Sequence, residues 1–135
     1  MTNIFSKDIF NNIGSSPSYY ENDPRLFIEE IYPNDEMENQ FYDYRIFVKN
    51  SVIQIEYWVI DNIFRLQTVT IFGDTDICIW SKYLKLSKEE LINLFGTPKV
   101  LVDTELHYYR EDRKYSVHFF LKNNEVFKII LAGSL

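Results

Sequence analysis

His107 and His118 are the side chains in this sequence best suited to acid–base chemistry near neutral pH. They fall in two predicted neighbouring strands, and Glu105 shares a strand face with His107 because side chains alternate along a strand. A carboxylate beside an imidazole could act as a general acid–base pair. Histidines on the outer face of a hairpin are, however, more often ordinary polar strand residues. We therefore expect no catalytic residues and no enzymatic activity, with a small hydrolase or isomerase built around both histidines as an alternative.

Other residue types offer little further chemistry. Cys78 is flanked by large apolar residues, which predicts a buried and unreactive thiol. Asp74 and Asp76 closely follow Gly73, but the segment lacks the remaining ligand positions of a calcium loop and predicts a plain turn. Four glycines leave no material for a phosphate-binding loop. We therefore expect no metal site and no cofactor.

Acidic residues are concentrated in one part of the chain. The net charge of the 135 residues is −6, but residues 21–44 hold eight acidic residues and one basic residue, a balance of −7. The rest of the chain, with twelve acidic and thirteen basic residues, has a balance of +1. We call residues 21–44 the acidic segment. An overall acidic chain argues against binding to nucleic acid or to an anionic membrane.

The acidic segment could be a solvated loop that aids solubility, as many charged runs are. Aromatic and aliphatic residues are interleaved with its acids, however, and aromatic residues in a charged surround are common in protein interfaces. The sequence therefore predicts a partner-binding surface, with the acids steering the partner and tyrosines as apolar anchors. The predicted residues are Glu29, Glu30, Asp35, Glu36, Glu38, Asp43, Tyr19, Tyr20 and Tyr42.

The first half of the chain has the period-2 pattern of β-strands. Phenylalanine (11) and tyrosine (10) are abundant, and both suit strands. Alternating runs at 41–49, 52–60 and 63–72 are divided by short polar breaks, which predicts an antiparallel meander. Residues 25–32 are expected to add a strand before it.

The second half begins with a clear helix signal. Ser87 and Glu90 form a predicted capping box, and Gly96 followed by Pro98 predicts the helix end. Three further strands are predicted at 100–110, 113–122 and 125–131. A second short helix is predicted at the N-terminus, where Phe5, Ile9 and Ile13 recur at helical spacing.

These elements predict an α+β fold. It would be mostly an antiparallel β meander, with two short helices packed on one face of the sheet. At 135 residues we expect a single domain over 1–135, made of pseudo-repeat halves at about 1–72 and 85–131. The strand order is left open, since meanders can be joined in several ways.

The C-terminal half resembles the helix-plus-three-strand unit of the β-lactamase inhibitor protein and of the small lipoprotein of outer-membrane assembly. In this chain the motifs are Gly96-Thr97-Pro98, Tyr108-Tyr109, Phe120-Leu121 and Asn124-Glu125-Val126, covering about a third of the sequence. The N-terminus has neither a signal peptide nor a lipid-acceptor cysteine, so the lipoprotein function is not expected. The resemblance implies a concave sheet that binds other proteins.

A small acidic binding domain without catalytic residues also resembles the bacterial immunity proteins of contact-dependent growth inhibition. That resemblance implies a cytoplasmic protein whose partner is a cognate protein toxin, with a basic nuclease domain favoured, and not nucleic acid or a membrane. A nuclease carries positive charge to hold phosphates, so an acidic inhibitor would be attracted to it. A non-catalytic assembly or adaptor protein of the same fold is the other alternative.

Overall fold

The computed structural model describes residues 3–5, 9–10, 13, 26–31, 42–48, 52–60, 63–75 and 78–133. For residues 26–31, 42–48, 58–60 and 64 this description covers the backbone.

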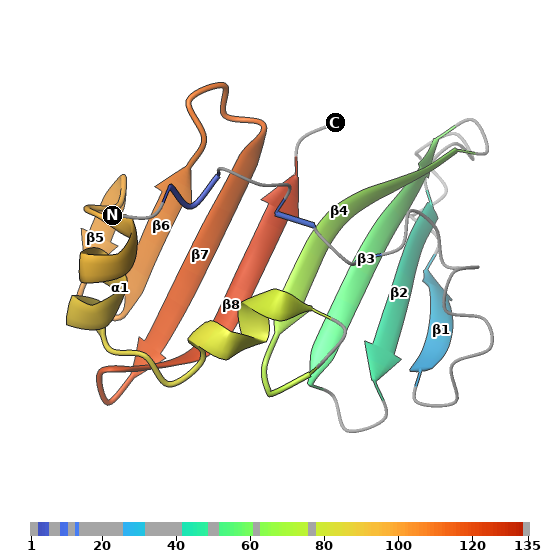
Figure 1. Ribbon diagram of the computed structural model, residues 1–135. Coiled ribbons are helices and arrows are strands. Elements are labelled where there is room, and N and C mark those ends of the chain that lie inside the picture. Colours follow the sequence, from blue (N-terminus) through green and yellow to red (C-terminus); the bar gives the residue numbers. More distant parts are fainter. Residues whose placement is uncertain are drawn as a thin grey trace.

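The described chain forms an eight-stranded antiparallel sheet (Figure 1). The strands are β1 (Leu26–Ile31), β2 (Tyr42–Val48), β3 (Ile53–Ile60), β4 (Ile63–Ile71), β5 (Val100–Val102), β6 (Glu105–Tyr109), β7 (Tyr115–Lys122) and β8 (Glu125–Gly133). Their spatial order is β1-β2-β3-β4-β8-β7-β6-β5. Each half of the chain therefore contributes a meander of four consecutive strands, as the alternating sequence runs predict for β1 to β4.

The two meanders join where β4 pairs with β8 at the centre of the sheet. Val69 pairs with Leu131 and Ile71 with Ile129, and all four side chains are fully buried. We call these four residues the central pairing. Because the last strand of each meander lies here, both halves share one hydrophobic core.

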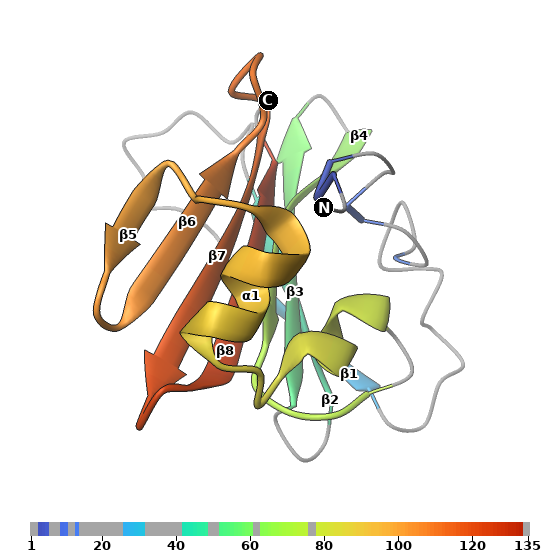
Figure 2. The ribbon, with the colours of Figure 1, turned by 60° about the vertical axis from the view of Figure 1, so that its left-hand side comes forward.

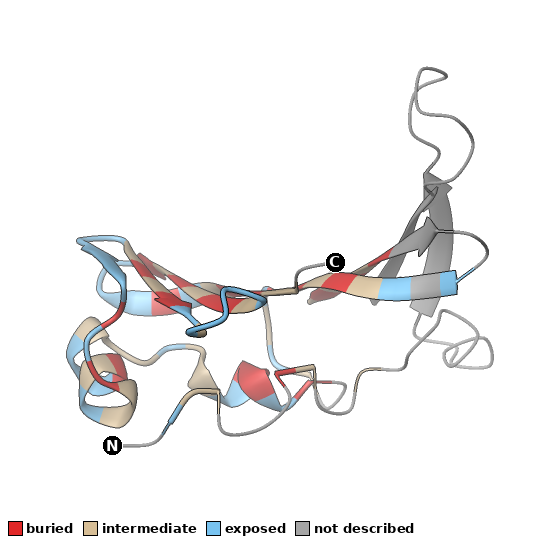
Figure 3. Cartoon of the chain, turned by 90° about the horizontal axis from the view of Figure 1, so that it is seen from above, coloured by how far each residue is buried: buried red, intermediate tan, exposed pale blue. Residues whose placement is uncertain are grey.

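One face of the sheet is covered by α1 (Lys88–Phe95) and by the 3₁₀-helix η2 (Ile79–Tyr83), as Figures 2 and 3 show. Leu91 of α1 and Trp80 of η2 belong to the buried core together with Phe119 of β7. The rings of Phe95 and Phe119 are stacked with centroids 6.0 Å apart. The fold is thus mostly β, in agreement with the predicted class. Of the two predicted helices, the described residues contain α1, whereas η2 was not predicted.

The capping signals predicted for α1 are all present. The Ser87 side chain accepts from the Glu90 backbone N–H at 3.1 Å, and the Glu90 carboxylate accepts from the Ser87 N–H at 3.1 Å. Gly96 ends the helix with φ 87°, in the left-handed region that glycine tolerates best. The Tyr108 hydroxyl donates to the Gly96 carbonyl at 2.7 Å, which ties the helix end to β6.

The predicted N-terminal helix falls largely outside the described residues. Ile4, Phe5, Ile9 and Phe10 lie in turns. Ile9 is nevertheless buried in the core, and its carbonyl accepts a hydrogen bond of 2.9 Å from the Trp80 indole N–H.

Two local predictions differ from the structure. Residues 100–110 do not form one strand, because Asp103 and Thr104 make a turn that folds β5 back onto β6. The sequence analysis also did not predict η2, because five residues are too few to show a helical period.

Candidate functional site

The face of the sheet opposite α1 and η2 is not covered by any described helix (Figure 3). One row of paired residues crosses this face through every strand, which we call the central row. From β5 to β1 it runs Val100, His107, His118, Ile130, Thr70, Gln54, Phe47 and Phe27. We call this side the open face. Its strands present alternate residues to it, while their neighbours in sequence enter the core.

Both histidines lie side by side on the open face. His107 of β6 pairs directly with His118 of β7, and their ring centroids are 4.5 Å apart at an interplanar angle of 78°. The rings of Tyr109 and Phe120 flank them, at 5.6 Å from His118 and 6.0 Å from His107. We define the histidine cluster as these side chains and two polar neighbours: His107, His118, Tyr109, Phe120, Glu105 and Ser116.

The environment of His118 keeps its ring uncharged at neutral pH. Burial and, to a smaller extent, the neighbouring His107 together lower the pKa of His118 to about 4. Its Nε2 forms a hydrogen bond of 2.8 Å with the Ser116 hydroxyl, in which the tautomer decides which group donates. A neutral imidazole with so low a pKa is a weak base at pH 7.

His107 has a less complete set of partners. Its Nε2 lies 3.6 Å from the Glu105 carboxylate, beyond hydrogen-bonding distance. This buried nitrogen has no hydrogen bond. Within the described ranges, no group of three or more histidine, cysteine or acidic residues has an arrangement that could hold a metal ion.

Apolar side chains surround the cluster at the β5 end of the open face. Val100 and Val102 are 39% and 48% exposed, and Tyr109 is 44% exposed. Lys128 extends over the Phe120 ring, with Nζ 4.3 Å from its centroid. Exposed aromatic and aliphatic groups beside polar ones are the composition of a protein-binding surface.

Four of the nine residues predicted to bind a partner lie in described strands. The row of Glu29 continues to Glu56, and the row of Asp43 continues to Arg65; both rows belong to the open face. Glu30 occupies a row that continues to the fully buried Tyr57, on the covered face.

Tyr42 pairs with Val59, two residues beyond Tyr57, and so occupies another row of the covered face. The register therefore separates the strand residues of the predicted site into two pairs. Asp35, Glu36, Glu38, Tyr19 and Tyr20 lie outside the described residues.

A second row links the histidine cluster with the acidic segment across the whole sheet. It runs through Tyr109, Ser116, Ala132, Thr68, Glu56, Arg45 and Glu29. The sequence analysis singled out the two histidines and the acidic segment but did not connect them. Tyr109, Ser116 and Phe120 were missed as site residues, although strict alternation with His107 and His118 places them on the same face.

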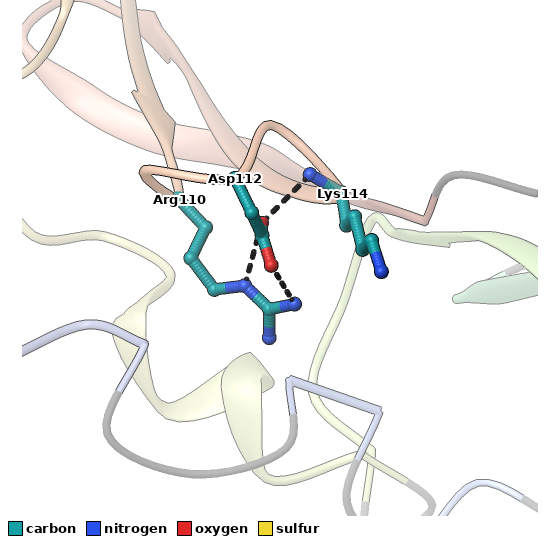
Figure 4. A network of polar contacts seen from close by, with 3 residues as sticks. All are labelled: Arg110, Asp112 and Lys114. Atoms are coloured by element: carbon teal, nitrogen blue, oxygen red, sulfur yellow. Dashed lines mark hydrogen bonds and ion pairs between the residues drawn. The ribbon is translucent and has the colours of Figure 1, made fainter.

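The turn between β6 and β7 holds a separate polar network (Figure 4). Asp112 accepts from the Arg110 guanidinium at 2.8 Å and from the Lys114 backbone N–H at 2.9 Å. The bound guanidinium lowers the pKa of Asp112 to about 2. Arg110 also stacks on the Tyr115 ring at 4.2 Å. These contacts fix the turn that carries the two histidine strands and do not converge on an open site.

Cys78 is fully buried, as its apolar neighbours predict. Burial raises the pKa of its thiol to about 11, so almost none of it is thiolate at neutral pH. Each helix in the described part of the chain is too short or too polar to cross a membrane.

Comparison of the chain with protein-family models, with curated proteins and with solved structures finds no match. The resemblances stated above therefore depend on the motifs and the general properties of this chain.

Proposed function

We propose that this protein is a cytoplasmic immunity protein that binds and neutralises a cognate toxin, a basic nuclease domain. The observation that carries the proposal is the row from Tyr109 to Glu29, which joins the exposed Tyr109 beside the histidines to the acidic segment on one uncovered sheet face. Glu29 and Asp43 stand in rows of that face, and residues 32–41, which hold three more of the predicted acids, connect β1 to β2.

The open face is large enough for a stable protein interface. Eight strands at a spacing of ~4.8 Å give a sheet about 34 Å wide. A standard interface takes ~800 Å² from each partner. The exposed valines and Tyr109 supply apolar contact area, and the acidic segment supplies attraction to a basic partner.

The first experiment tests neutralisation. The gene immediately upstream is expressed in bacterial cells with and without this protein, since a toxin and its immunity protein would be encoded together. We expect growth arrest by the upstream product and relief of the arrest by this chain. Normal growth without this protein, or arrest that persists with it, would contradict the immunity function and favour the adaptor alternative.

The second experiment tests steering by local charge. The double reversal Glu36→Lys with Glu38→Lys should slow association with the purified toxin by about 10-fold at low ionic strength and flatten its salt dependence. The melting temperature should remain nearly unchanged. The measurement is stopped-flow fluorescence at several salt concentrations.

The matched control is Asp103→Lys with Glu111→Lys, which changes the net charge equally at two exposed turn positions of the C-terminal half. We expect it to leave the association rate within about twofold of the unaltered protein. Equal slowing by both pairs would mean that total charge matters and that the acidic segment has no special role.

A histidine-dependent hydrolase or isomerase is the second candidate, and the Ser116–His118 hydrogen bond is the observation that favours it. A serine hydrogen-bonded to an imidazole is the start of a nucleophile–base pair. The pKa of about 4 at His118 makes it a poor base for activating a hydroxyl at pH 7. We therefore favour binding of a protein toxin over catalysis as the function.

A further inference from the structure

A cavity of about 640 Å³ lies at the end of the sheet where β4 ends, β7 turns into β8, and η2 leads towards α1. These segments lie close together in both Figure 1 and Figure 2. The volume is within the usual range of small-molecule sites, ~300–1,000 Å³. Asp43 pairs with Trp58, near one end of β3, whereas Gly73 of the cavity hydrogen-bonds to Val52, just before the other end. The cavity is therefore separate from the acidic strand positions.

Three lysines from different parts of the fold line this cavity. Lys82 comes from η2, Lys85 from the link to α1, and Lys122 from the end of β7. Two carboxylates, Asp74 and Glu125, also line it, which leaves one positive charge in excess. Among the described residues, ion pairs join Arg110 to Asp112 and His107 to Glu105. The three lysines therefore have no described carboxylate within 4.0 Å.

Two phenylalanines provide apolar walls beside the lysines. Phe72 and Phe127 both line the cavity and are 48% and 46% exposed, so both rings offer apolar surface to a ligand. Phe127 lies at the register shift between β7 and β8, where Phe120 pairs with Lys128 and Leu121 with Val126. The shift leaves Phe127 as an extra residue in β8, and such bulges re-aim side chains.

The backbone around the lysines is held in place. Lys85 has φ 71°, a left-handed conformation that is unfavourable for a lysine. Its N–H donates to the Val126 carbonyl at 2.8 Å, and the Val126 N–H donates to the Leu86 carbonyl at 2.9 Å. These two bonds fix the link to β8. Strained residues held by their surroundings are concentrated at functional sites.

We propose that this cavity binds a small soluble phosphate monoester that carries an apolar group. The excess positive charge of the lining lysines would attract a phosphate dianion, and the apolar group would cover the exposed rings of Phe72 and Phe127. Asp74 and Glu125 could accept hydrogen bonds from hydroxyl groups of the ligand. This site does not depend on the proposed immunity function, because it uses none of the residues assigned to that role.

Titration of the full chain with phenyl phosphate, followed by ¹H–¹⁵N NMR, tests the proposal. We expect saturable shifts of the Gly73, Asn123 and Phe127 amide signals. Phenyl phosphate should bind about 10-fold more tightly than inorganic phosphate, because its ring covers apolar surface. Benzyl alcohol, which has the ring but not the charge, should not saturate the site. Equal affinity for phenyl phosphate and inorganic phosphate would overturn the role of the two rings.

Substitution of the lysines tests their role. Lys82→Gln with Lys122→Gln should weaken phenyl phosphate binding by about 10-fold or more. The matched control, Lys99→Gln with Lys114→Gln, removes two exposed lysines that do not line the cavity and should leave the affinity unchanged. Equal weakening by both pairs would overturn the site.

A third experiment distinguishes binding of a soluble phosphate monoester from binding of a membrane that contains one. Vesicles of phosphatidylcholine with and without phosphatidic acid are sedimented with the protein, since phosphatidic acid presents the same phosphate monoester. We expect the protein to remain in the supernatant. Co-sedimentation that the double lysine variant abolishes would overturn the assignment to a soluble ligand.

Discussion

At the scale of single residues, position on the sheet decides the chemistry of the two histidines more than residue type does. Both are polar strand residues by sequence, yet direct pairing brings their rings to 4.5 Å and partly buries them. Burial disfavours the charged imidazolium of His118, and the neighbouring His107 acts in the same direction. His118 is consequently uncharged at pH 7.

The titration of His118 is the first prediction at this scale. We expect its ring to titrate with a midpoint near pH 4, because burial and the neighbouring His107 both lower its pKa. In His107→Gln the midpoint should move upward but remain below 6.5, since burial is the larger cause. The measurement is an NMR titration of the histidine ring signals. A midpoint near 6.5 in the unaltered protein would show that the site is solvated.

The stability of the protein should follow from the same pKa. In the unfolded chain His118 takes up a proton near pH 6.5, whereas in the folded chain it remains neutral down to about pH 4. Its contribution to stability is therefore complete above pH 6.5, is lost as the pH falls to about 4, and changes no further below that. His118→Gln should lose less stability between pH 7 and pH 4 than the unaltered protein, measured by urea denaturation at both pH values.

At the scale of secondary-structure elements, helix α1 depends on a few local contacts and one tertiary bond. The capping box satisfies its first turn, and Gly96 ends it at positive φ. The Tyr108 hydroxyl then bonds to the Gly96 carbonyl inside the core, where burial also raises the pKa of Tyr108 to about 12. This buried bond connects the helix end to the strand that carries His107.

Removal of that hydroxyl is the prediction at this scale. Tyr108→Phe should lower the free energy of unfolding by about 1–2 kcal/mol, because the Gly96 carbonyl loses its buried donor. Tyr109→Phe is the matched control, since Tyr109 lies next in sequence but is exposed on the other face, and we expect a change within about 0.5 kcal/mol. Urea denaturation measures both. Equal effects would show that the hydroxyl bond contributes nothing.

At the scale of the whole molecule, the central pairing makes the two meanders one structure. Val69, Ile71, Ile129 and Leu131 are fully buried where β4 meets β8. Neither meander can bury these side chains alone. The acidic strands of the first half and the histidine cluster of the second half therefore share one continuous sheet.

Shortening a side chain of the central pairing should weaken both halves together. Leu131→Ala should lower the free energy of unfolding by about 2–5 kcal/mol, whereas Val102→Ala at the exposed edge strand should cost less than about 1 kcal/mol. Tryptophan fluorescence and far-UV circular dichroism should give one coincident transition in each variant. Two separate transitions would mean that the halves unfold independently.

Much of the local structure follows from sequence patterns. The runs around β2, β3 and β4 alternate over much of their length, and the Ser87–Glu90 box marks the start of α1 to the residue. The prediction failed where an element is too short to leave a clear sequence pattern. A two-residue turn at Asp103 divides one expected strand, and the five residues of η2 are too few to show a helical period. For the site, the histidine neighbours were predictable from alternation, but the separation of Glu29 from Glu30 depends on which face each row takes.

The sequence by itself determined helix α1, most of the strands, the acidic segment and the pairing of the two histidine strands, because these depend on residues near one another in the chain. Only the tertiary structure decided that β4 meets β8, that one row joins Tyr109 to Glu29, and that Lys122 lines the same cavity as the distant Lys82 and Lys85. The physical reason is that strand order and face depend on which hydrophobic surfaces bury each other, which is settled by the whole core and not by any local pattern.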